Sequence, residues 1–443
     1  MYAVLSLDMK KEDSIIGLRD GVGQGFKVVP VPFGIPQIDR ANHVYTVGQT
    51  GTGKSTLLRN MLIQDIRAGR GLVLIDPHGD LAQELIDYVP KRRTNEVVFI
   101  NPMDVEHPIG INFFKHVPQN EMQRALAVEQ VVSVFKHVWD LDDVTTPRLL
   151  NLLRNTVAAL MHAPNTSVLS IYHLLTDTKY RERILRRVTD MEVLKYWRNE
   201  FAKLPERQRQ ETMASTLNKA FVINASPALR YTLGQTGSKL DFKKLMDNER
   251  IIICDLSKGR MGESSSNLLG AMILVQLYMA ALARADDDRS LRSPCHVYVD
   301  EFQNFGSSSV FSDMLSESRK YGLRLTLAHQ FMSQVDPTLQ DAVLGNVGSI
   351  ISFRVGSKDA SILAREYAFA GREIQPSNFS DLATHEVVVR LQNKKERLMP
   401  FHARTLPPIQ DRSGQRDKIV NYNRMHFAKP LATVKKAIDS EFI

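Results

Sequence analysis

The feature that most constrains the fold is the segment at residues 48–55, GQTGTGKS, which fits the pattern G-x-x-x-x-G-K-[ST]. It directly follows the apolar run HVYTV (43–47) and leads into LLRNMLIQDI, whose apolar residues recur at helical spacing. A strand, a glycine-rich loop and a helix in this order are the context in which the pattern binds phosphate. The segment therefore predicts a nucleotide-binding loop.

Each position of this loop suits a bound triphosphate. Gly48, Gly51 and Gly53 let the backbone curl so that successive N–H groups point at phosphate oxygens, and the following helix N-terminus adds a favourable dipole. We expect Lys54 to reach the β- and γ-phosphates and Ser55 to ligate Mg²⁺. The predicted ATP-binding residues are Gly48, Thr50, Gly51, Thr52, Gly53, Lys54, Ser55 and Thr56.

A second element is HVYVDEF (296–302), a mostly apolar run that ends in Asp300 and Glu301. Two adjacent carboxylates at the end of a buried strand are costly unless they hold a cation or relay a proton. In a parallel sheet this end faces the same crevice as the phosphate loop. We expect Asp300 to hold Mg²⁺, directly or through water, and Glu301 to act as the general base. The alternative is a pair of solvated acids in a loop.

Two further polar residues belong to this half of the chain. Gln330 follows the apolar run LRLTLAH, where it can hydrogen-bond the γ-phosphate or the attacking water, or can simply end a strand. Arg319 ends the helical run MLSESRKYG. It either complements the helix C-terminus or serves as an arginine finger for the ATP of a neighbouring subunit.

Other nucleotide-binding classes fit the sequence less well. A GTPase needs a guanine-reading N-K-x-D, whereas residues 393–396 read NKKE, which we interpret as a polar turn. A small-molecule kinase needs an arginine-rich lid. The segment IDPHGDL contains Asp76, His78 and Asp80. It suggests either a metal site or, as we prefer, a helix N-terminus capped by Asp80.

Apolar, β-branched runs alternate with helical segments, which predicts an α/β domain with a mainly parallel sheet. The expected strands are 43–47, 71–76, 96–101, 250–256, 296–302, 323–329 and 349–355, with HEVVVRL (385–391) as an edge strand. Between 119 and 235 the periodicity is helical throughout, which indicates an inserted all-α domain. The predicted parts are a lead-in of short strands and loops (1–40), the ATPase domain (41–118 and 236–408), the insertion and a tail (409–443) without an assigned role.

The amino-acid composition indicates which kind of partner the protein binds and in which compartment it works. The chain of 443 residues has 57 Lys and Arg against 49 acids, an excess that suits a polyanion or simple solubility. Cys254 and Cys295, the only cysteines, read as buried free thiols in a reducing compartment. The apolar run at 267–283 is shorter than the ~20 residues that span a bilayer, and we interpret it as a buried helix. We therefore expect a cytoplasmic protein, associated with a membrane through partners if at all.

The order of these parts resembles a known group. It runs GQTGTGKST, IDPHGDL, the helical insertion, IIICDLSKGRMGE, YVDEFQNF, ESRKYGLRLTLAHQ and ISFRVGSKDA. This order is similar to the HerA/FtsK superfamily and, within it, to the VirD4/TraG/TraD-type coupling proteins of conjugation and type IV secretion. The resemblance covers roughly residues 33–408. It implies a RecA-like fold and a hexameric, ATP-driven pump that passes DNA through a central channel.

The resemblance also implies roles for residues. Lys54 and Ser55 match the Walker A lysine and serine, Asp300 and Glu301 the Walker B pair, and Gln330 the sensor glutamine. Arg319 falls where coupling proteins place a trans-acting arginine, and Arg354 is a second candidate for that role. The insertion would be the all-α domain with which coupling proteins meet DNA or the relaxosome. Membrane-embedded coupling proteins begin with transmembrane helices, for which this sequence has no matching run.

The expected function is therefore an ATPase that translocates DNA without sequence specificity, works as a homo-hexamer, and meets relaxase or secretion-system partners. One alternative is an assembly or secretion ATPase of the VirB4 kind, which acts on protein partners. A second alternative is a module in which nucleotide only holds an oligomer together. Stimulation of ATP hydrolysis by DNA separates the first from the others.

Overall fold

The computed structural model describes residues 13–20, 30–114, 120–305, 308–394 and 396–442. Residues 1–12 and 21–29 of the predicted lead-in lie outside these ranges, as do residues 115–119 around the predicted start of the insertion.

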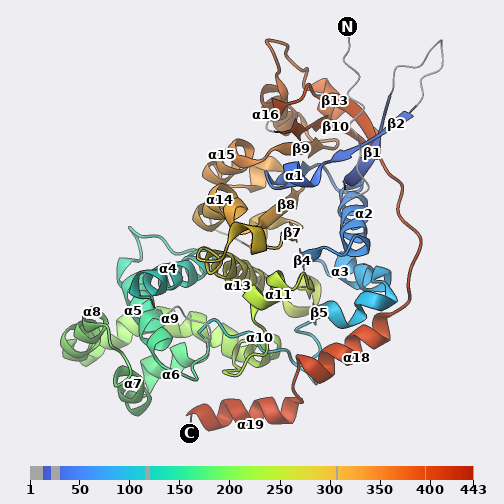
Figure 1. The fold of residues 1–443 in the computed structure, drawn as a ribbon. Coiled ribbons are helices and arrows are strands. Elements are labelled where there is room, and N and C mark those ends of the chain that lie inside the picture. The colour runs from blue at the N-terminus through green and yellow to red at the C-terminus, as the bar shows by residue number, and fades with distance from the viewer. Residues whose placement is uncertain (1–12, 21–29, 115–119, 306–307, 395, 443) are drawn as a thin grey trace, which may run out of the picture.

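One large sheet organises the described part of the chain (Figure 1). Its strands are β1 (Ser14–Asp20), β2 (Pro30–Ile35), β3 (Val44–Val47), β4 (Gly71–Asp76), β5 (Val97–Ile100), β6 (Ile251–Asp255), β7 (Cys295–Val299), β8 (Leu323–His329), β9 (Ser349–Ser352), β10 (Glu386–Arg390) and β13 (Phe401–Thr405). They lie in the order β2-β1-β13-β10-β9-β3-β8-β7-β4-β6-β5. The strands from β9 to β5 are parallel to their neighbours, and β10, β13, β1 and β2 extend the sheet in antiparallel fashion. The predicted α/β fold with a mainly parallel sheet is confirmed.

The prediction that HEVVVRL forms an edge strand is wrong. This run forms β10, which pairs with β9 on one side and with β13 on the other. Beyond β13 lie β1 and β2, from the start of the chain. Whether a strand is interior depends on partners that are remote in the sequence, and an alternating run does not reveal them.

Helices cover both faces of the sheet (Figure 1). One face carries α2 (Lys54–Arg67) and α3 (Asp80–Leu85), and the other carries α13 (Glu263–Leu282), α14 (Ser308–Glu317), α15 (Pro337–Asn346) and α16 (Ser357–Tyr367). Alternate residues of β4 belong to separate cores: Leu72 and Leu74 pack with α2 and α3, and Val73 and Ile75 pack with α13. This two-sided burial explains why β4, β5 and β6 are apolar apart from a terminal aspartate in β4 and in β6. Short helices lie at 37–40 (α1), 242–247 (α11), 258–261 (α12) and 377–380 (α17).

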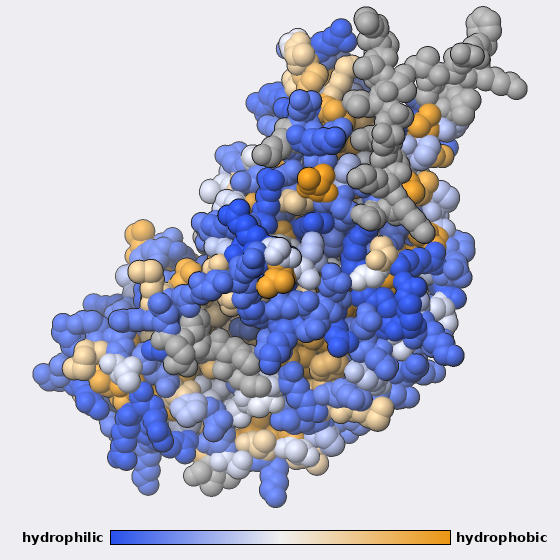
Figure 2. Space-filling model, in the orientation of Figure 1, coloured by the Kyte–Doolittle hydropathy of each residue, from blue (hydrophilic) through white to orange (hydrophobic). Residues whose placement is uncertain are grey.

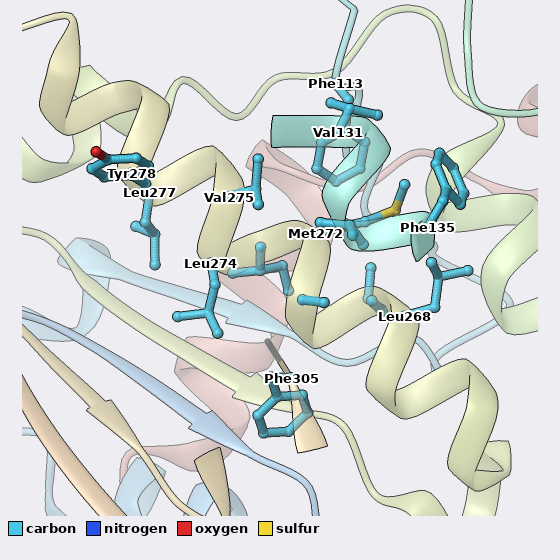
Figure 3. Close-up of a cluster of buried hydrophobic side chains, with 14 of the residues drawn as sticks. Phe113, Val131, Phe135, Leu268, Met272, Leu274, Val275, Leu277, Tyr278 and Phe305 are labelled. Atoms are coloured by element: carbon cyan, nitrogen blue, oxygen red, sulfur yellow. The ribbon is translucent and has the colours of Figure 1, made fainter. Parts of the chain in front are cut away.

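Helix α13 contains the apolar run at 267–283. Among the described residues it is the one helix long and apolar enough to cross a membrane, but 83% of its most apolar window is buried in the protein. Leu268 and Met272 face Val131 and Phe135 of the helix at Glu121–Val138, and Phe305 packs on the opposite side (Figure 3). The prediction of a buried core helix is confirmed.

A helical lobe separates β5 from β6 in the chain. It consists of α4 (Glu121–Val138), α5 (Pro147–His162), α6 (Ser170–Thr176), α7 (Thr178–Leu185), α8 (Met191–Lys195), the π-helix Tyr196–Glu200, α9 (Glu206–Ala225) and α10 (Pro227–Leu233). Asn120, Asp177 and Asp190 cap α4, α7 and α8 by accepting backbone N–H bonds. The lobe lies beside the sheet domain and contacts it chiefly through α4 and α13 (Figure 1).

Two C-terminal helices connect the sheet to this lobe. In α18 (Arg416–His426), the Asn423 amide donates to the carbonyl of Val97 at 3.0 Å and accepts from the N–H of Phe99 at 2.7 Å. These bonds occupy the outer edge of β5, which would otherwise be open to pairing. Helix α19 (Leu431–Phe442) then reaches the lobe, where the ring of Phe442 stacks on His173 at 3.6 Å.

The two cysteines are free and buried, as predicted. The face of the molecule in Figure 2 is mostly hydrophilic, and its hydrophobic residues appear singly or in small groups.

Candidate nucleotide-binding site

The phosphate loop joins β3, which lies between the parallel strands β9 and β8, to α2. Gly51 and Gly53 have φ values of +76° and +119°, a region that side chains rarely adopt. Gly53 is the residue immediately before the helix, and α2 begins at Lys54. The strand, loop and helix predicted around residues 48–55 are therefore present, with their glycines where the backbone requires them.

The Lys54 side chain lies inside the curve of this loop. It is 7% exposed, and its ammonium donates to the carbonyl of Gly48 and, at 3.1 Å, to that of Gln49. Burial lowers the pKa of Lys54, while the negative charges of Glu301 and Asp300 oppose this effect. A cation held within this loop is placed to meet phosphate oxygens.

The hydroxyls of Ser55 and Thr56 lie in the first turn of α2. They line a cavity of about 270 Å³ together with Asp76 and Asp300, which come from the ends of β4 and β7. Residues that are 245 positions apart in the sequence, Ser55 and Asp300, thus share one cavity at the carboxyl edge of the sheet. Hydroxyl and carboxylate oxygens are the donors that Mg²⁺ prefers, so the residues present fit this cation.

The two acids after β7 are both buried, Asp300 at 7% and Glu301 at 5% exposure. The pKa of Asp300 is raised to about 7, chiefly by burial and then by the charges of Asp76 and Glu301, while the charge of Lys54 opposes the rise. Glu301 has a left-handed backbone (φ 47°), and its carboxylate accepts a hydrogen bond from Gln303 at 2.9 Å. Such strain in a non-glycine residue is concentrated at functional sites. The solvated-loop alternative for these acids is excluded by their burial.

Gln330 lies at the same edge. It directly follows β8, and its side-chain oxygen accepts a hydrogen bond from the Thr50 hydroxyl at 2.8 Å. The structure therefore brings together the phosphate loop, the acid pair and Gln330.

Arg319 is not part of this cluster. It lies in the 3₁₀ turn Ser318–Tyr321, which precedes β8, so it sits at the amino edge of the sheet. The seven residues of β8 separate it from that carboxyl edge by about 20 Å. Arg319 is exposed, and its charge acts on Asp39 and His43, which precede β3. It therefore lies too far from the phosphate loop of its own chain to contact a nucleotide bound there.

Arg354, the second candidate for a trans-acting arginine, lies at the carboxyl edge of the sheet. It follows β9, and its carbonyl accepts the N–H of Gln49 at 2.8 Å, so it lies beside the phosphate loop of its own chain.

The segment IDPHGDL has a structural role that differs in detail from the prediction. Gly79, not Asp80, precedes the first residue of α3, and it has a φ of +87°. The helix start is capped from a distance by Asp76, whose carboxylate accepts the N–H groups of His78 and Ala82 at 2.9 Å each. The expectation that Asp80 is the cap is wrong because Asp80 is already the first residue of the helix. The described residues contain no group of three or more His, Cys, Asp or Glu suited to a metal.

The segment NKKE is also remote from the site. The N–H of Lys394 donates to Asp39 at 2.9 Å, on the amino side of β3. Asn393 and Glu396 belong to the two short paired strands β11 (Gln392–Asn393) and β12 (Glu396–Arg397).

Two neighbours of the loop have no motif in the sequence. Phe353 is fully buried, and a Cβ added to Gly48 would lie 2.5 Å from its Cβ. His385 donates its backbone N–H to the carbonyl of Thr52 at 2.9 Å. Both come from segments that follow the loop by about 300 positions or more, and the only sequence signal for them is the need for glycine at 48 and 53.

The family model of the type IV secretion-system coupling protein DNA-binding domain matches residues 28–365. The chain belongs to this family. The matched range contains the phosphate loop, the acid pair, Gln330 and the helical lobe. No curated protein sequence matches the chain.

Several solved structures share the fold of this coupling-protein relative. The unbound bacterial conjugative coupling protein TrwBdeltaN70 is 16% identical, with a TM-score of 0.63 over 85% of this chain and 87% of that chain. Plasmid coupling protein TrwB in complex with ADP and Mg²⁺ is 16% identical, with a TM-score of 0.59 over 86% and 89%. VirB4 of Thermoanaerobacter pseudethanolicus is 17% identical, with a TM-score of 0.59 over 89% and 96%.

Proposed function

We propose that this coupling-protein relative is an ATP-driven motor that moves DNA and hydrolyses ATP at the subunit interfaces of a homo-hexameric ring. The observation that carries the proposal is the convergence of the phosphate loop and the buried acids Asp300 and Glu301 at one edge of the sheet.

Each residue at this edge of the sheet has its own proposed role in ATP hydrolysis. Loop N–H groups and Lys54 bind the phosphates of ATP, and Thr50, Thr52 and Thr56 line the loop and the helix start around them. Ser55 and Asp300 would hold Mg²⁺, which when bound neutralises charge on the transferred phosphoryl group. Glu301 orients a water and accepts its proton. Gln330, already bonded to Thr50, is placed to connect the nucleotide to the segment after β8.

Arg319 completes the site of the next subunit. Its place at the amino edge, on an exposed turn, supports a role in trans rather than in its own nucleotide site. A positive charge supplied there would stabilise the transition state of phosphoryl transfer.

DNA is the proposed substrate of the motor. The excess of positive residues and the family of DNA-binding domains to which the chain belongs support a nucleic-acid partner held through its phosphates, without base reading. A relaxase or another secretion-system protein is the partner proposed for the helical lobe, with membrane association through such a partner.

The test is ATP hydrolysis with and without single- and double-stranded DNA, together with Glu301→Gln. We expect DNA to stimulate turnover. We expect Glu301→Gln to retain ATP binding and to lose about 100-fold or more in turnover, the size of a general-base contribution. Turnover that survives this substitution would refute the assignment of the base.

A second candidate is an assembly or secretion ATPase that acts on protein partners, and the shared fold with VirB4 supports it. It predicts an ATPase activity that is indifferent to DNA. Binding of ATP without turnover, in a chain with Glu301 intact, would instead indicate a module whose nucleotide only holds an oligomer together.

A further inference from the structure

His385 lies against the phosphate loop because of the antiparallel extension of the sheet. It precedes β10, which runs opposite to β9, so the start of β10 lies at the edge where β3 and β9 end. Its carbonyl accepts the N–H of Thr405, at the end of β13, at 2.9 Å. Two strands outside the parallel part thus hold this residue at the nucleotide site.

The bond from the His385 N–H to the Thr52 carbonyl fixes the peptide between Thr52 and Gly53. In a planar trans peptide the C=O and N–H groups point in opposite directions. A Thr52 carbonyl held against His385 therefore turns the Gly53 N–H away from His385, toward the interior of the loop. Inward-facing N–H groups are the phosphate ligands of such loops.

The imidazole of His385 packs on Gly53. A Cβ built on Gly53 would lie 2.6 Å from His385 Nδ1 and 3.1 Å from the ring of Phe353. Within the described residues Nδ1 is buried without a hydrogen-bond partner, which costs free energy. The backbone of His385 is left-handed, with a φ of 68°. A strained residue with a buried, unpaired ring nitrogen is not what stability alone would select, and both features meet at the loop.

We propose that His385 is a positioning residue of the nucleotide site, whose backbone N–H and ring together hold Gly53 in its phosphate-binding conformation. The inference rests on the proposed ATPase function and adds to it a residue from outside the Walker motifs. His385 acts through Gly53 and does not touch the reacting atoms.

The experiment compares His385→Gly and His385→Asn in equilibrium binding of a fluorescent, non-hydrolysable ATP analogue with Mg²⁺. Glycine keeps the left-handed backbone and the N–H but removes the ring, whereas asparagine also tolerates this conformation and has a polar atom near the position of Nδ1. We expect His385→Gly to weaken binding about tenfold and His385→Asn to recover it to within about threefold of wild type. Because the loop contacts the phosphates before and during the reaction, KM for ATP should rise while kcat changes little.

His402→Asn, an exposed histidine on the neighbouring strand β13, is the matched control and should bind as wild type. Wild-type binding by His385→Gly would overturn the inference. So would a loss that follows a lowered melting temperature and is not recovered by asparagine. If the wild-type chain itself does not bind the analogue, the proposed function fails instead, so the two failures are distinguishable.

Discussion

Asp300 is buried beside two other carboxylates, those of Asp76 and Glu301, and its ionisation is therefore costly. Its pKa is raised to about 7, chiefly by burial. A carboxylate must be ionised to bind a metal, so Mg²⁺ competes with a proton at this position. A Lys54 ammonium nearby offsets only part of the cost.

We expect the affinity for Mg²⁺ in the presence of ATP to fall as the pH is lowered from about 8 to about 6, by about tenfold, because the ionised fraction falls from about nine-tenths to about one-tenth. Titration of Mg²⁺-dependent nucleotide binding measures this. Asp300→Asn should bind Mg²⁺ weakly at every pH. Asp80→Asn, on the exposed part of the same cavity, should keep the wild-type dependence. A flat profile for the wild-type chain would contradict the prediction.

A second buried cluster connects α2 to β7, the two elements next to the nucleotide site. Asp65 of α2 accepts bonds from Arg40 at 2.7 Å and from the hydroxyl of Tyr298 at 2.6 Å. Arg40 also donates to Tyr298 at 2.7 Å, and all three side chains are nearly inaccessible to solvent. Since Tyr298 lies two residues before Asp300, the cluster links the helix of the phosphate loop to the strand that carries the acids.

Asp65→Ala should lower the free energy of unfolding by about 3–5 kcal/mol, because it leaves the charge of Arg40 buried without its partner. Asp411→Ala is the matched control. It removes an exposed ion pair with Arg67, for which we expect a change of at most about 1 kcal/mol. Urea unfolding of both variants is the measurement. Similar losses in the two variants would show that the buried cluster is not what holds these elements.

At the scale of elements, helix α19 shows how the end of the chain is fastened to the lobe. Ser170 donates to the carboxylate of Glu441 at 2.9 Å, beside the stacked rings of Phe442 and His173. Burial raises the pKa of Glu441 to about 7 from an ordinary value of 4.5, although bonds from Ser170 and Tyr180 oppose this. The folded chain therefore holds this proton more tightly than the unfolded chain does.

It follows that docking of α19 is strongest below about pH 4.5 and weakens as the pH rises to about 7, since the unfolded segment loses its proton first. Hydrogen exchange of residues 431–442 should be faster at pH 8 than at pH 5.5 after correction for intrinsic rates. Glu441→Gln should remove most of this difference, and Asp439→Asn, an exposed neighbour, should not. Equal protection at both pH values would refute the role of Glu441.

Short runs of apolar residues were enough to predict the parallel strands. GLVLID and LRLTLAH, chosen as strands at 71–76 and 323–329, form β4 and β8 with the same bounds. The phosphate loop and the acids after β7 were also predictable, because the chemistry of a bound triphosphate dictates residue types at fixed spacing. Each of these signals lies within about ten consecutive residues.

What the sequence did not reveal depends on distant partners. The strand β13, with alternating exposure, was not predicted, and the short strands expected in the lead-in, which include β1, were not placed in the sheet. For this reason β10 was mistaken for an edge. The tail received no role because the bonds of Asn423 to β5 involve residues more than 320 positions away. His385 was missed for the same reason: a histidine before an alternating run becomes informative only when β10 is placed beside β9.

At the scale of the whole molecule, the proposed function assigns complementary halves of one catalytic site to the two edges of the sheet. The carboxyl edge holds the phosphate loop, Asp300, Glu301 and Gln330, and the amino edge holds the exposed Arg319. A strand length of about 20 Å separates them within a chain. Head-to-tail contacts in a ring bring one edge of each subunit to the other edge of its neighbour, so each interface would combine the two halves.

This arrangement makes mixing of inactive variants informative. Arg319→Ala and Glu301→Gln should each be nearly inactive alone, for different reasons. In a random 1:1 mixture about a quarter of the interfaces would pair an intact Glu301 with an intact Arg319, because each head-to-tail interface takes one residue from each subunit. We therefore expect the mixture to regain ATPase activity after dissociation and reassembly. If Arg319 served its own nucleotide, no interface of the mixture would be intact and activity would stay at the level of the separate variants.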